Sequence, residues 1–320
     1  MSDNLNTTVN GTQPLSCSSN PPAEKIGKIF AYCLIFVVSL TGNTVIGIIV
    51  YKTKTMRKPI NFFIVNTAMS DLLLAIFLVS REIPVLYSDS WLFGGPLGQA
   101  LWKLTAFLAD VSTAVSIQSL LLIAVGRFGA VVFPLRSPLI SSKLCPFFIL
   151  VTWIVAMAFH SPYLFGLKLA EYHGRLVCRW HWKEAFGESS SIESCILSLC
   201  VALTFIPLVA IAILYIIIFL KLKSKRSPGE QSANAGQLRQ QRERNVLKMA
   251  IAIVLGFAVC WLPFAICLLL SRFVSDLWSC GFRYFITVAR FMAQANCSIN
   301  PCICFIFSRN CREGLKTLIS

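Results

Sequence analysis

Seven long apolar segments constrain the fold of this chain more than any other feature of its sequence. A helix that crosses the hydrocarbon core of a bilayer needs about 20 mostly apolar residues. The sequence contains seven such segments, at residues 29–51, 61–86, 97–132, 144–167, 192–222, 246–271 and 282–307. Because 56% of the 320 residues are hydrophobic and the mean hydropathy is +0.70, a soluble domain is not expected. We predict an all-α membrane protein whose seven transmembrane helices form one bundle.

The seven segments divide the chain into three parts. Residues 1–28 are predicted to be a polar N-terminal tail, residues 29–307 the transmembrane domain, and residues 308–320 the C-terminal segment. The tail has no apolar stretch behind a basic start, so we expect no cleavable signal peptide. It carries N-glycosylation sequons at Asn6 and Asn10, which are useful only if the tail lies outside the cell.

The distribution of charge predicts the orientation of the bundle. With the tail outside, the cytoplasmic segments hold most of the 29 Lys and Arg residues but only Glu230, Glu243 and Glu313 of the 14 acidic residues. This agrees with the excess of basic residues in cytoplasmic loops of membrane proteins. The net charge of +15 is therefore attributed to orientation and to attraction by inner-leaflet lipids, and no nucleic-acid partner is expected. The same basic surface could also meet an acidic protein.

Two classes of membrane protein are disfavoured by the sequence. The chain has 13 cysteines and three histidines, but no cysteine pair stands at metal-ligand spacing with a histidine, so an intramembrane metalloenzyme is not expected. The sequence has no internal repeats, so a transporter built from duplicated halves has no support.

The sixth segment contains the sequence FAVCWLPF at residues 257–264. Proline has no N–H for the helical ladder, and its ring displaces the carbonyl one turn earlier, so Pro263 predicts a kink. Such a kink is a candidate hinge. The alternative is a static kink that only improves packing.

Polar residues within the apolar segments are candidates for function, because each costs free energy in hydrocarbon. Asp71 is the most costly of them, since a carboxylate in mid-membrane needs a cation, a proton or several donors. A sodium ion held by Asp71 with Ser116, Asn296 and Asn300 would satisfy it, provided that the fold brings these residues together. The alternative is a protonated Asp71 within a structural hydrogen-bond cluster.

From about Gly42 to Leu318 the sequence resembles the rhodopsin-like, or class A, G-protein-coupled receptors. The landmarks, in chain order, are Gly42, Asn43 and Val45, then Asn66 and Asp71, Arg127, Trp153 and Pro162, Pro207 and Tyr215, Phe257 with residues 260–263, and residues 296–301. Each is weak alone, but seven landmarks in the right order are specific. Residues 308–318 resemble the short amphipathic eighth helix of the family, with Leu315 and Leu318 on its apolar side.

The resemblance implies a switch between the ligand site and the cytoplasm. In the family, the residues equivalent to Phe257 and Trp261 repack when an agonist binds, and the helix below Pro263 swings outward to open a cleft for a G protein. Arg127 is then expected to bridge to an acid in the closed state, for which Glu243 is the candidate, and to reach into the open cleft. The alternative for Arg127 is an interfacial anchor.

Two departures from the family concern this switch. The acidic-Arg-Tyr signature reads Gly126-Arg127-Phe128, so Arg127 lacks a neighbouring carboxylate, which favours the open state. The NPxxY signature ends in Cys304 instead of tyrosine, so no hydroxyl bridges toward Tyr215, which weakens the open state. The two changes act in opposite directions.

A third departure concerns the outer face. Where the family usually has a cysteine that pins the second outer loop, this chain has Trp102. The loop cysteine, Cys178, therefore lacks its usual partner. It is expected to pair with Cys17 or Cys280, or to stay free, and Cys17 could also pair with Cys280.

The resemblance also narrows the ligand. A retinal receptor is not expected, because Gln294 stands where that branch of the family keeps its lysine, and amine receptors are disfavoured, because Ala109 replaces their carboxylate. Charges of both signs and many aromatic rings in the outer half of the bundle favour a peptide. The ligand-binding candidates are Arg81, Glu82, Asp110, Thr113, Phe264, Arg290, Phe291 and Gln294.

We therefore predict a multi-pass receptor of the plasma membrane, activated by an extracellular peptide and coupled to a heterotrimeric G protein. It is not expected to be an enzyme or to hold a cofactor, apart from the candidate sodium ion. Its expected partners are the peptide, the G protein, the lipid bilayer and, by resemblance to the family, arrestin. The alternatives are a non-signalling ligand-binding or scavenging receptor on the same fold and, third, a channel or transporter.

Overall fold

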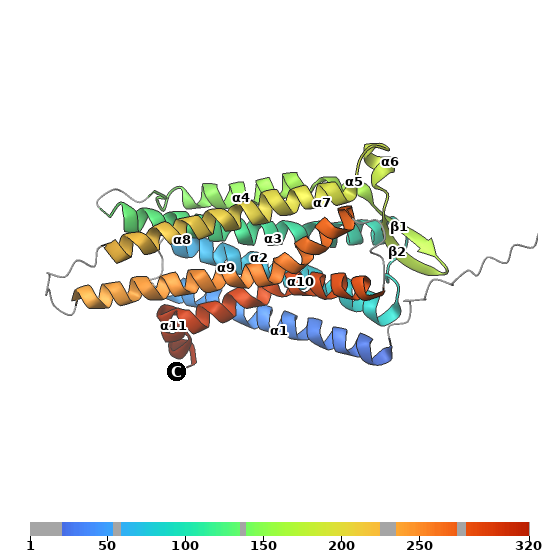
Figure 1. Ribbon diagram of the computed structural model, residues 1–320. Helices are drawn as coiled ribbons and strands as arrows, with labels where there is room; N and C mark the ends of the chain where they lie inside the picture. Colours follow the sequence, from blue (N-terminus) through green and yellow to red (C-terminus); the bar gives the residue numbers. More distant parts are fainter. Residues whose placement is uncertain (1–20, 54–58, 135–138, 225–234, 274–279, 320) are drawn as a thin grey trace, which may run out of the picture.

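The structure is a computed structural model that describes residues 21–53, 59–134, 139–224, 235–273 and 280–319. Figure 1 shows its helices running side by side along one axis. The elements are α1 (Pro22–Lys52), α2 (Pro59–Ser88), α3 (Gly95–Val132), α4 (Cys145–His160), α5 (Pro162–Gly166), β1 (Leu167–Tyr172), β2 (Arg175–Trp180), α6 (Trp182–Phe186), α7 (Ile192–Cys200), a π-helical turn (Val201–Phe205), α8 (Ile206–Ser224), α9 (Ala235–Phe273), α10 (Cys280–Phe307) and α11 (Arg309–Ile319).

These elements form seven long helical units. Two of the units are interrupted: α4 continues into α5, and α7 continues through the π-helical turn into α8. Each interruption lies next to a proline, Pro162 or Pro207, which cannot donate the backbone hydrogen bond of a regular helix. Helix α3 packs against α2, α4 and α8, and α10 packs against α9, α1 and α2. The seven-helix bundle predicted from the sequence is thereby confirmed.

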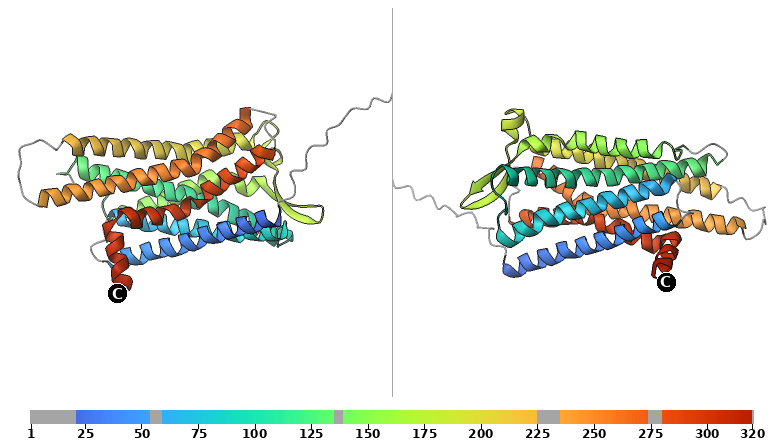
Figure 2. Two further views of the ribbon diagram at one scale, coloured as in Figure 1. Left: turned by 60° about the horizontal axis from the view of Figure 1, so that its bottom comes forward. Right: turned by 180° about the vertical axis from the view of Figure 1, so that it is seen from behind.

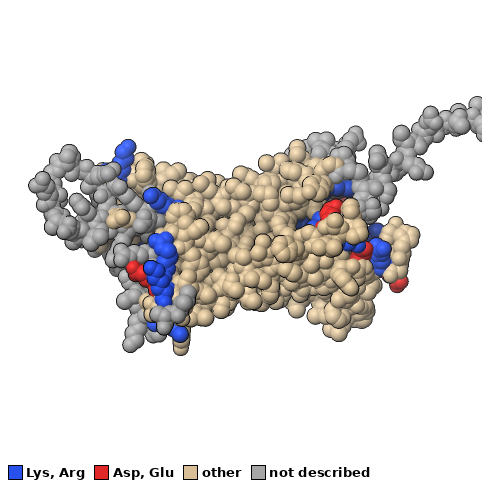
Figure 3. All heavy atoms as spheres, turned by 90° about the horizontal axis from the view of Figure 1, so that it is seen from below, with Lys and Arg blue, Asp and Glu red and all other residues tan. Residues whose placement is uncertain are grey.

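The surface of the bundle is that of a membrane-spanning protein. Six helical stretches of the described chain are long and apolar enough to cross a bilayer, at residues 22–52, 60–88, 95–132, 145–166, 194–224 and 251–271. The seventh helix, α10, is less apolar because it carries Arg283, Arg290, Gln294, Asn296 and Asn300. In Figure 3 the described charged side chains gather at the two ends of the visible face, with an uncharged band between them.

The two ends of the bundle differ in structure. At one end, β1 and β2 form an antiparallel hairpin that pairs Leu167 with Trp180 and Tyr172 with Arg175, and the start of α1 lies at the same end (Figure 1). His173 and Gly174 connect the strands with φ values of 49° and 73°, the positive values that two-residue hairpin turns favour. Neither strand was predicted from the sequence. We call this the hairpin end, and the other the α11 end.

Helix α11 leaves the bundle axis at the α11 end, as both views in Figure 2 show. Its Leu315 and Leu318 pack against the cluster formed by Ile49 and Val50 of α1. Charged residues, including Arg312 and Lys316, are exposed on the same helix. The short amphipathic eighth helix expected from the sequence is therefore present, with its apolar side against α1.

Landmark polar residues join the helices to one another. Asn43 of α1 donates hydrogen bonds to the carbonyl oxygens of Ser39, at 3.0 Å, and of Cys297 in α10, at 3.2 Å. Asn66 of α2 donates to Ser119 Oγ of α3, at 2.8 Å, and accepts from Trp153 Nε1 of α4, at 3.0 Å. Such hydrogen bonds stabilise helix contacts in lipid, where apolar burial does not distinguish one helix from another.

Candidate ligand-binding and switch sites

A cavity of about 390 Å³ lies at the hairpin end of the bundle. Residues of α2, α3, α9 and α10 line it, together with the hairpin and the outer parts of the fourth and fifth helical units. Seven of the eight predicted ligand-binding residues line this cavity: Arg81, Glu82, Asp110, Thr113, Phe264, Arg290 and Gln294. Phe291 is not among its lining residues. Its ring instead packs edge-on against Tyr32 of α1, with the ring centroids 5.2 Å apart.

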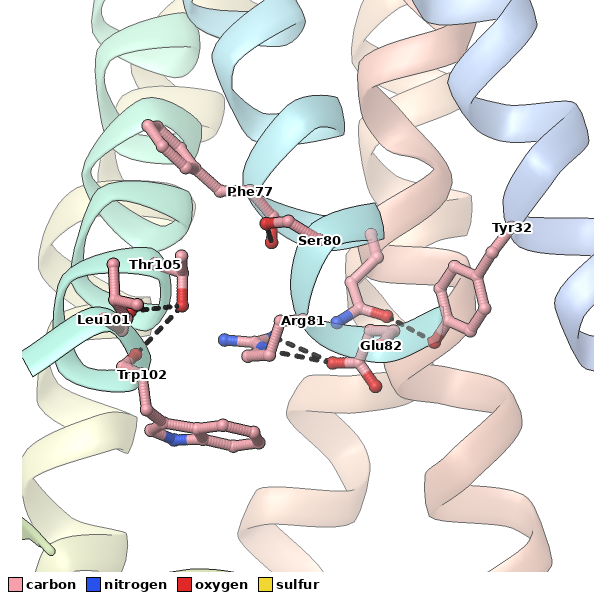
Figure 4. Close-up of polar contacts among 9 residues, drawn as sticks. Tyr32, Phe77, Ser80, Arg81, Glu82, Leu101, Trp102 and Thr105 are labelled. Carbon is pink, nitrogen blue, oxygen red and sulfur yellow. Dashed lines mark hydrogen bonds and ion pairs between the residues drawn. The ribbon is translucent and has the colours of Figure 1, made fainter. Parts of the chain in front are cut away.

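The charged residues of the cavity differ in how they are paired. Arg81 donates hydrogen bonds from Nε and from a terminal nitrogen to Glu82 Oε1, at 3.1 and 2.9 Å, so these adjacent charges of α2 largely neutralise each other (Figure 4). By contrast, Asp110 of α3 and Arg290 of α10 form no ion pair within the described part of the chain. The cavity therefore presents one unpaired carboxylate and one unpaired guanidinium.

Gln294 is held in place from outside the cavity wall. The hydroxyl of Tyr32 donates a hydrogen bond of 2.9 Å to Gln294 Oε1, the contact drawn beside Tyr32 in Figure 4. This leaves the side-chain amide nitrogen of Gln294 as the group that can donate to a ligand.

Sequence reasoning missed part of the cavity wall. His160 and Tyr163, on either side of the break between α4 and α5, line the cavity, as does Cys178 of β2. The rings of His160 and Tyr163 are in edge-on contact, with their centroids 5.7 Å apart. Tyr163 in turn contacts the ring of Trp180, at a centroid distance of 5.2 Å. The one sequence signal for this wall was the proline between them, since Pro162 marks the point where the fourth helix turns toward the hairpin.

Among the described cysteines, Cys178 of β2 forms no disulfide, and the contacts that the structure shows between the hairpin and the bundle are non-covalent. The backbone N–H of Trp91 donates to the carbonyl of Leu176, at 2.8 Å, and the N–H of Leu176 donates to Ser90 Oγ, at 2.9 Å. The Trp91 indole N–H donates to the carbonyl of Gly98, at 3.1 Å, and its ring packs edge-on against Trp102, at 5.0 Å. Trp102, the residue that replaces the usual cysteine, thus supports the segment that holds the hairpin.

Asp89 adds an electrostatic contact to this attachment. It forms ion pairs with Lys25 at the start of α1 and with Arg175 of the hairpin, the latter at 3.8 Å. The hydrogen bond from Lys25 lowers the pKa of Asp89 below its ordinary value. A carboxyl with a depressed pKa stabilises the fold above its unfolded-state pKa, and this contribution is lost only as the pH falls through the lower, folded-state value. The contact is therefore present throughout the neutral range.

Two aromatic residues of α9 connect the cavity with the bundle core. Trp261 lines the cavity and lies edge-on to Phe264, with centroids 6.3 Å apart. One turn earlier in α9, Phe257 is fully buried and packs with Ile117 and Leu120 of α3, in the cluster that Trp261 also contacts. Pro263 lies inside the same helix. A ligand that displaces the Trp261 ring would therefore act directly on the packing of Phe257.

Below Trp261 the bundle contains a cluster of buried polar residues, which we call the Asp71 cluster: Asp71, Ser112, Ser116, Asn296 and Asn300. Asn300 Nδ2 donates to Asp71 Oδ2, at 2.9 Å, and Ser116 lies beside the same carboxylate. Ser112 and Asn296 stand one helical turn from Ser116 and Asn300, on the same helix faces. Within the described chain, one oxygen of each of these five residues is buried without a hydrogen-bond partner.

The Asp71 cluster fits a hard monovalent cation. The five orphaned atoms, Asp71 Oδ1, Ser112 Oγ, Ser116 Oγ, Asn296 Oδ1 and Asn300 Oδ1, are all oxygens, which is the donor set that hard cations prefer. One of them belongs to a carboxylate, which supplies the compensating charge. Of the predicted residues, Ser116 and Asn300 lie beside Asp71, while Asn296 and Ser112 follow one turn away on the same two helices.

The inner switch residues lie toward the α11 end. Arg127 of α3 is half-buried and lies close enough to Tyr215 of α8 for electrostatic interaction. A second cavity of about 60 Å³ is lined by Tyr215, Asn300 and Cys304, where the family would have its tyrosine. Gly126 stands close to α2, since a Cβ there would come within 3.1 Å of Ile60 Cγ1. The side chain that replaces Gly126 in the family would therefore need Ile60 to shift.

Several predicted residues lie outside what the structure describes. Asn6, Asn10 and Cys17 precede the first described residue. Glu243 and Cys280 lie within α9 and α10, but their side chains are not described. The Arg127–Glu243 bridge, the glycosylation sites and the outer disulfides therefore remain predictions.

Comparison with known proteins agrees with this architecture. Residues 42–303 match the family described as 7 transmembrane receptor (rhodopsin family). A QRFP-like peptide receptor of Branchiostoma floridae is 30% identical over 308 residues, covering 94% of this chain and 79% of that receptor. Neuropeptide FF receptor 2 of Mus musculus is 31% identical, covering 90% and 71%, and the RYamide receptor of Drosophila melanogaster is 31% identical, covering 91% and 63%. The chain belongs to the rhodopsin family of seven-transmembrane receptors.

Proposed function

We propose that this receptor is activated by an extracellular peptide and transmits the signal to a heterotrimeric G protein across the plasma membrane. The single observation that carries the proposal is the cavity of about 390 Å³ whose inner wall is Trp261, the residue in contact with the buried core around Phe257. A receptor of this family is a signalling protein and not an enzyme. In this proposal the hairpin end and the N-terminal tail face outward.

The chemistry of the cavity supports a peptide as the ligand. It offers two carboxylates, two guanidinium groups, amide and hydroxyl groups, and the aromatic rings of Trp102, Trp180 and Phe264. A peptide presents charged, amide and aromatic groups together, so it can pair with such a mixed wall. The relatives compared above are named as peptide receptors, which supports the same ligand class here.

The mechanism we propose is a shift between two packings of α9. An agonist that binds the open state more tightly shifts the population toward it, by an amount set by its differential affinity. Displacement of Trp261 would repack Phe257, and the helix below Pro263 would move away from α3. Arg127 would then leave its closed-state contacts, for which Glu243 is the proposed acidic partner, and enter the cleft that receives the G protein.

We further propose that the Asp71 cluster binds sodium and stabilises the closed packing. Its unpaired oxygens come from α2, α3 and α10, so an ion among them would hold these helices together. The remaining proposed partners are the lipid bilayer, whose inner leaflet would meet the basic residues of the receptor's cytoplasmic side, and, after activation, arrestin. The scavenger alternative rests on Gly126, Phe128 and Cys304, which alter the switch without altering the ligand cavity.

The test is a signalling assay in cells that express the receptor at the surface. Amidated and free-acid neuropeptides would be screened for activation of a panel of G proteins, beside an Arg127→Ala variant with equal surface expression. The proposal expects activation of at least one G protein, and loss of that activation in the variant. Uptake of a peptide by both proteins without G-protein activation by either would support the scavenger instead.

A further inference from the structure

Two free cysteines meet where α10 ends and α11 begins. Cys304 of α10 and Cys311 of α11 are both free thiols, and their side chains are hydrogen-bonded to each other. Both residues are buried, with exposed fractions of 8% and 3%, in an apolar cluster with Ile46 of α1 and Ala68 of α2. Thiols in contact meet the first requirement for a disulfide, which cannot form between cysteines whose side chains point apart.

The backbone at the junction of the two helices holds these thiols together. The N–H of Ser308 donates to the carbonyl oxygen of Cys304, at 2.8 Å, and the N–H of Cys311 donates to Ser308 Oγ, at 3.3 Å. Ser308 thus caps the first turn of α11. The guanidinium of Arg312 also donates to carbonyl oxygens in the last turn of α10. The chain therefore passes from one helix into the next with Cys311 fixed beside Cys304.

The surroundings favour Cys311 as the thiol that attacks an oxidant. The hydrogen bond from Cys304, with help from the Ser308 hydroxyl and the charge of Arg312, lowers the pKa of Cys311. Cys311 also lies in the first turn of α11, where the helix dipole favours a negative charge. The thiolate is the reactive form of a cysteine. The cavity of about 60 Å³ that Cys304 lines exceeds the roughly 10–15 Å³ that one water needs, so it has room for hydrogen peroxide beside the pair.

We propose that Cys304 and Cys311 form a redox-sensitive pair, which a hydroperoxide converts into a disulfide that fastens the start of α11 to the end of α10. The Cys311 thiolate attacks one oxygen of hydrogen peroxide, the O–O bond breaks, and a sulfenic acid and hydroxide form. The Cys304 sulfur then attacks the Cys311 sulfur, and the sulfenic oxygen leaves as water with the Cys304 proton. In sum, two thiols lose two electrons and two protons, and one peroxide becomes two waters.

The free thiols are the resting form in this proposal. In the orientation proposed above, the α11 end lies in the cytoplasm, where thiols are kept reduced and disulfides are transient. A dithiol reductant would restore the pair by thiol–disulfide exchange. Two cysteines that only pack as small apolar residues would instead stay unlinked when an oxidant is present, which gives the test its opposite outcome.

The test uses purified receptor in nanodiscs, treated with hydrogen peroxide, alkylated with N-ethylmaleimide and digested with trypsin. Trypsin cuts after Arg309, between the two cysteines, so a disulfide joins peptide 291–309 to peptide 310–312. Wild type is expected to give the joined peptide after treatment and to lose it in dithiothreitol. Peptide 291–309 also contains Cys297 and Cys302, and fragmentation should place the link at Cys304. This assignment needs no variant.

The matched control is Cys302→Ser, because Cys302 lies in the same helix and is exposed; this variant should keep the joined peptide. Cys304→Ser should lose it, and its melting temperature reports whether it folds. Hydrogen exchange of residues 309–319 should slow several-fold in oxidised wild type and not in Cys304→Ser, since the disulfide fastens α11.

Three results would overturn the proposal. The first is no joined peptide in wild type at peroxide concentrations that oxidise the exposed Cys302. The second is a joined peptide that persists in Cys304→Ser. The third is a disulfide that leaves hydrogen exchange in α11 unchanged. The measurement needs neither a peptide ligand nor a G protein, so failure of the proposed function would appear separately, as absent signalling with the disulfide still formed.

Discussion

At the scale of single residues, the structure separates polar groups that are satisfied from those that are not. Asn43 and Asn66 bridge helices with hydrogen bonds between 2.8 and 3.2 Å. The Asp71 cluster, in contrast, contains five buried oxygens that have no hydrogen-bond partner among the described residues. An unsatisfied buried polar group costs about 1–3 kcal/mol, so a cluster of this kind is expected to have a ligand of its own.

The sodium proposal predicts an ion-specific effect on stability. Wild-type receptor should melt at a higher temperature in NaCl than in KCl of equal concentration, because binding to the folded state stabilises it. Asp71→Asn should remove this difference, since the compensating charge is lost. Ser298→Ala is the control and should retain the difference, because the Ser298 hydroxyl donates within α10 to the carbonyl of Ala295, at 2.7 Å. Equal sodium effects in wild type and Asp71→Asn would show that the cluster is not the ion site.

The cavity of about 60 Å³ beside Cys304 predicts a gain of signalling on substitution. Cys304→Tyr would place a hydroxyl toward Tyr215, where it can bridge the inner ends of α8 and α10 in the open state. We expect basal or agonist-stimulated G-protein activation to rise several-fold, which corresponds to about 1 kcal/mol. Cys304→Phe fills similar space without the hydroxyl and should not produce the rise. If both variants behave alike, the hydroxyl bridge has no role in this receptor.

At the scale of elements, the hairpin shows how a non-covalent contact replaces a covalent one. In this chain Trp91, Trp102 and Ser90 hold the hairpin, through one backbone–backbone hydrogen bond, one hydrogen bond from the Leu176 N–H to Ser90 Oγ, and the aromatic contact between the two tryptophans. A hydrogen bond contributes about 1 kcal/mol and an aromatic pair about 0.5–1.5 kcal/mol. Contacts of this size are expected to hold the hairpin against the cavity, and to break at a lower cost than a disulfide would.

A substitution at Trp102 tests this replacement. Trp102→Cys restores the cysteine of the family in the cavity that Cys178 also lines, so a disulfide between them is expected, detectable as the loss of two free thiols by mass spectrometry. Trp102→Ser is the matched control, because it removes the aromatic contact without providing a thiol. We expect Trp102→Ser to melt at a lower temperature than wild type, and Trp102→Cys to recover part of the loss only under oxidising conditions. Equal melting temperatures for wild type and Trp102→Ser would argue against the aromatic support.

At the scale of the whole molecule, a chain of contacts joins the two ends of the bundle. Trp261 lines the outer cavity, Phe257 packs beside it in the core, and Tyr215 and Arg127 interact near the α11 end. Two packings of α9 suffice to couple these sites, because a close-packed core changes between discrete arrangements. In the proposed mechanism, Gly126 and Cys304 would alter the balance between the two packings, while Trp261, Phe257, Tyr215 and Arg127 are all present.

The sequence predicts the large features of this molecule and misses its local contacts. Long apolar segments and landmarks such as Asn43, Asp71 and Pro263 predict the bundle, because lipid leaves helices as almost the only choice. The hairpin was not predicted, since residues 167–180 lack a clear two-residue alternation and the strands depend on contacts with Trp91. The roles of His160 and Tyr163 depend on the turn at Pro162, and the unpaired state of Asp110 depends on where every other charge lies.

The measurement that tests the account most directly is nucleotide exchange on purified heterotrimeric G proteins by the receptor reconstituted in nanodiscs. The account predicts that wild-type receptor accelerates GTP binding to at least one G-protein class, that a peptide agonist increases this rate, and that Arg127→Ala abolishes both effects. No acceleration of any class by folded receptor, with a bound peptide present, would contradict the account and leave a binding protein on a receptor fold.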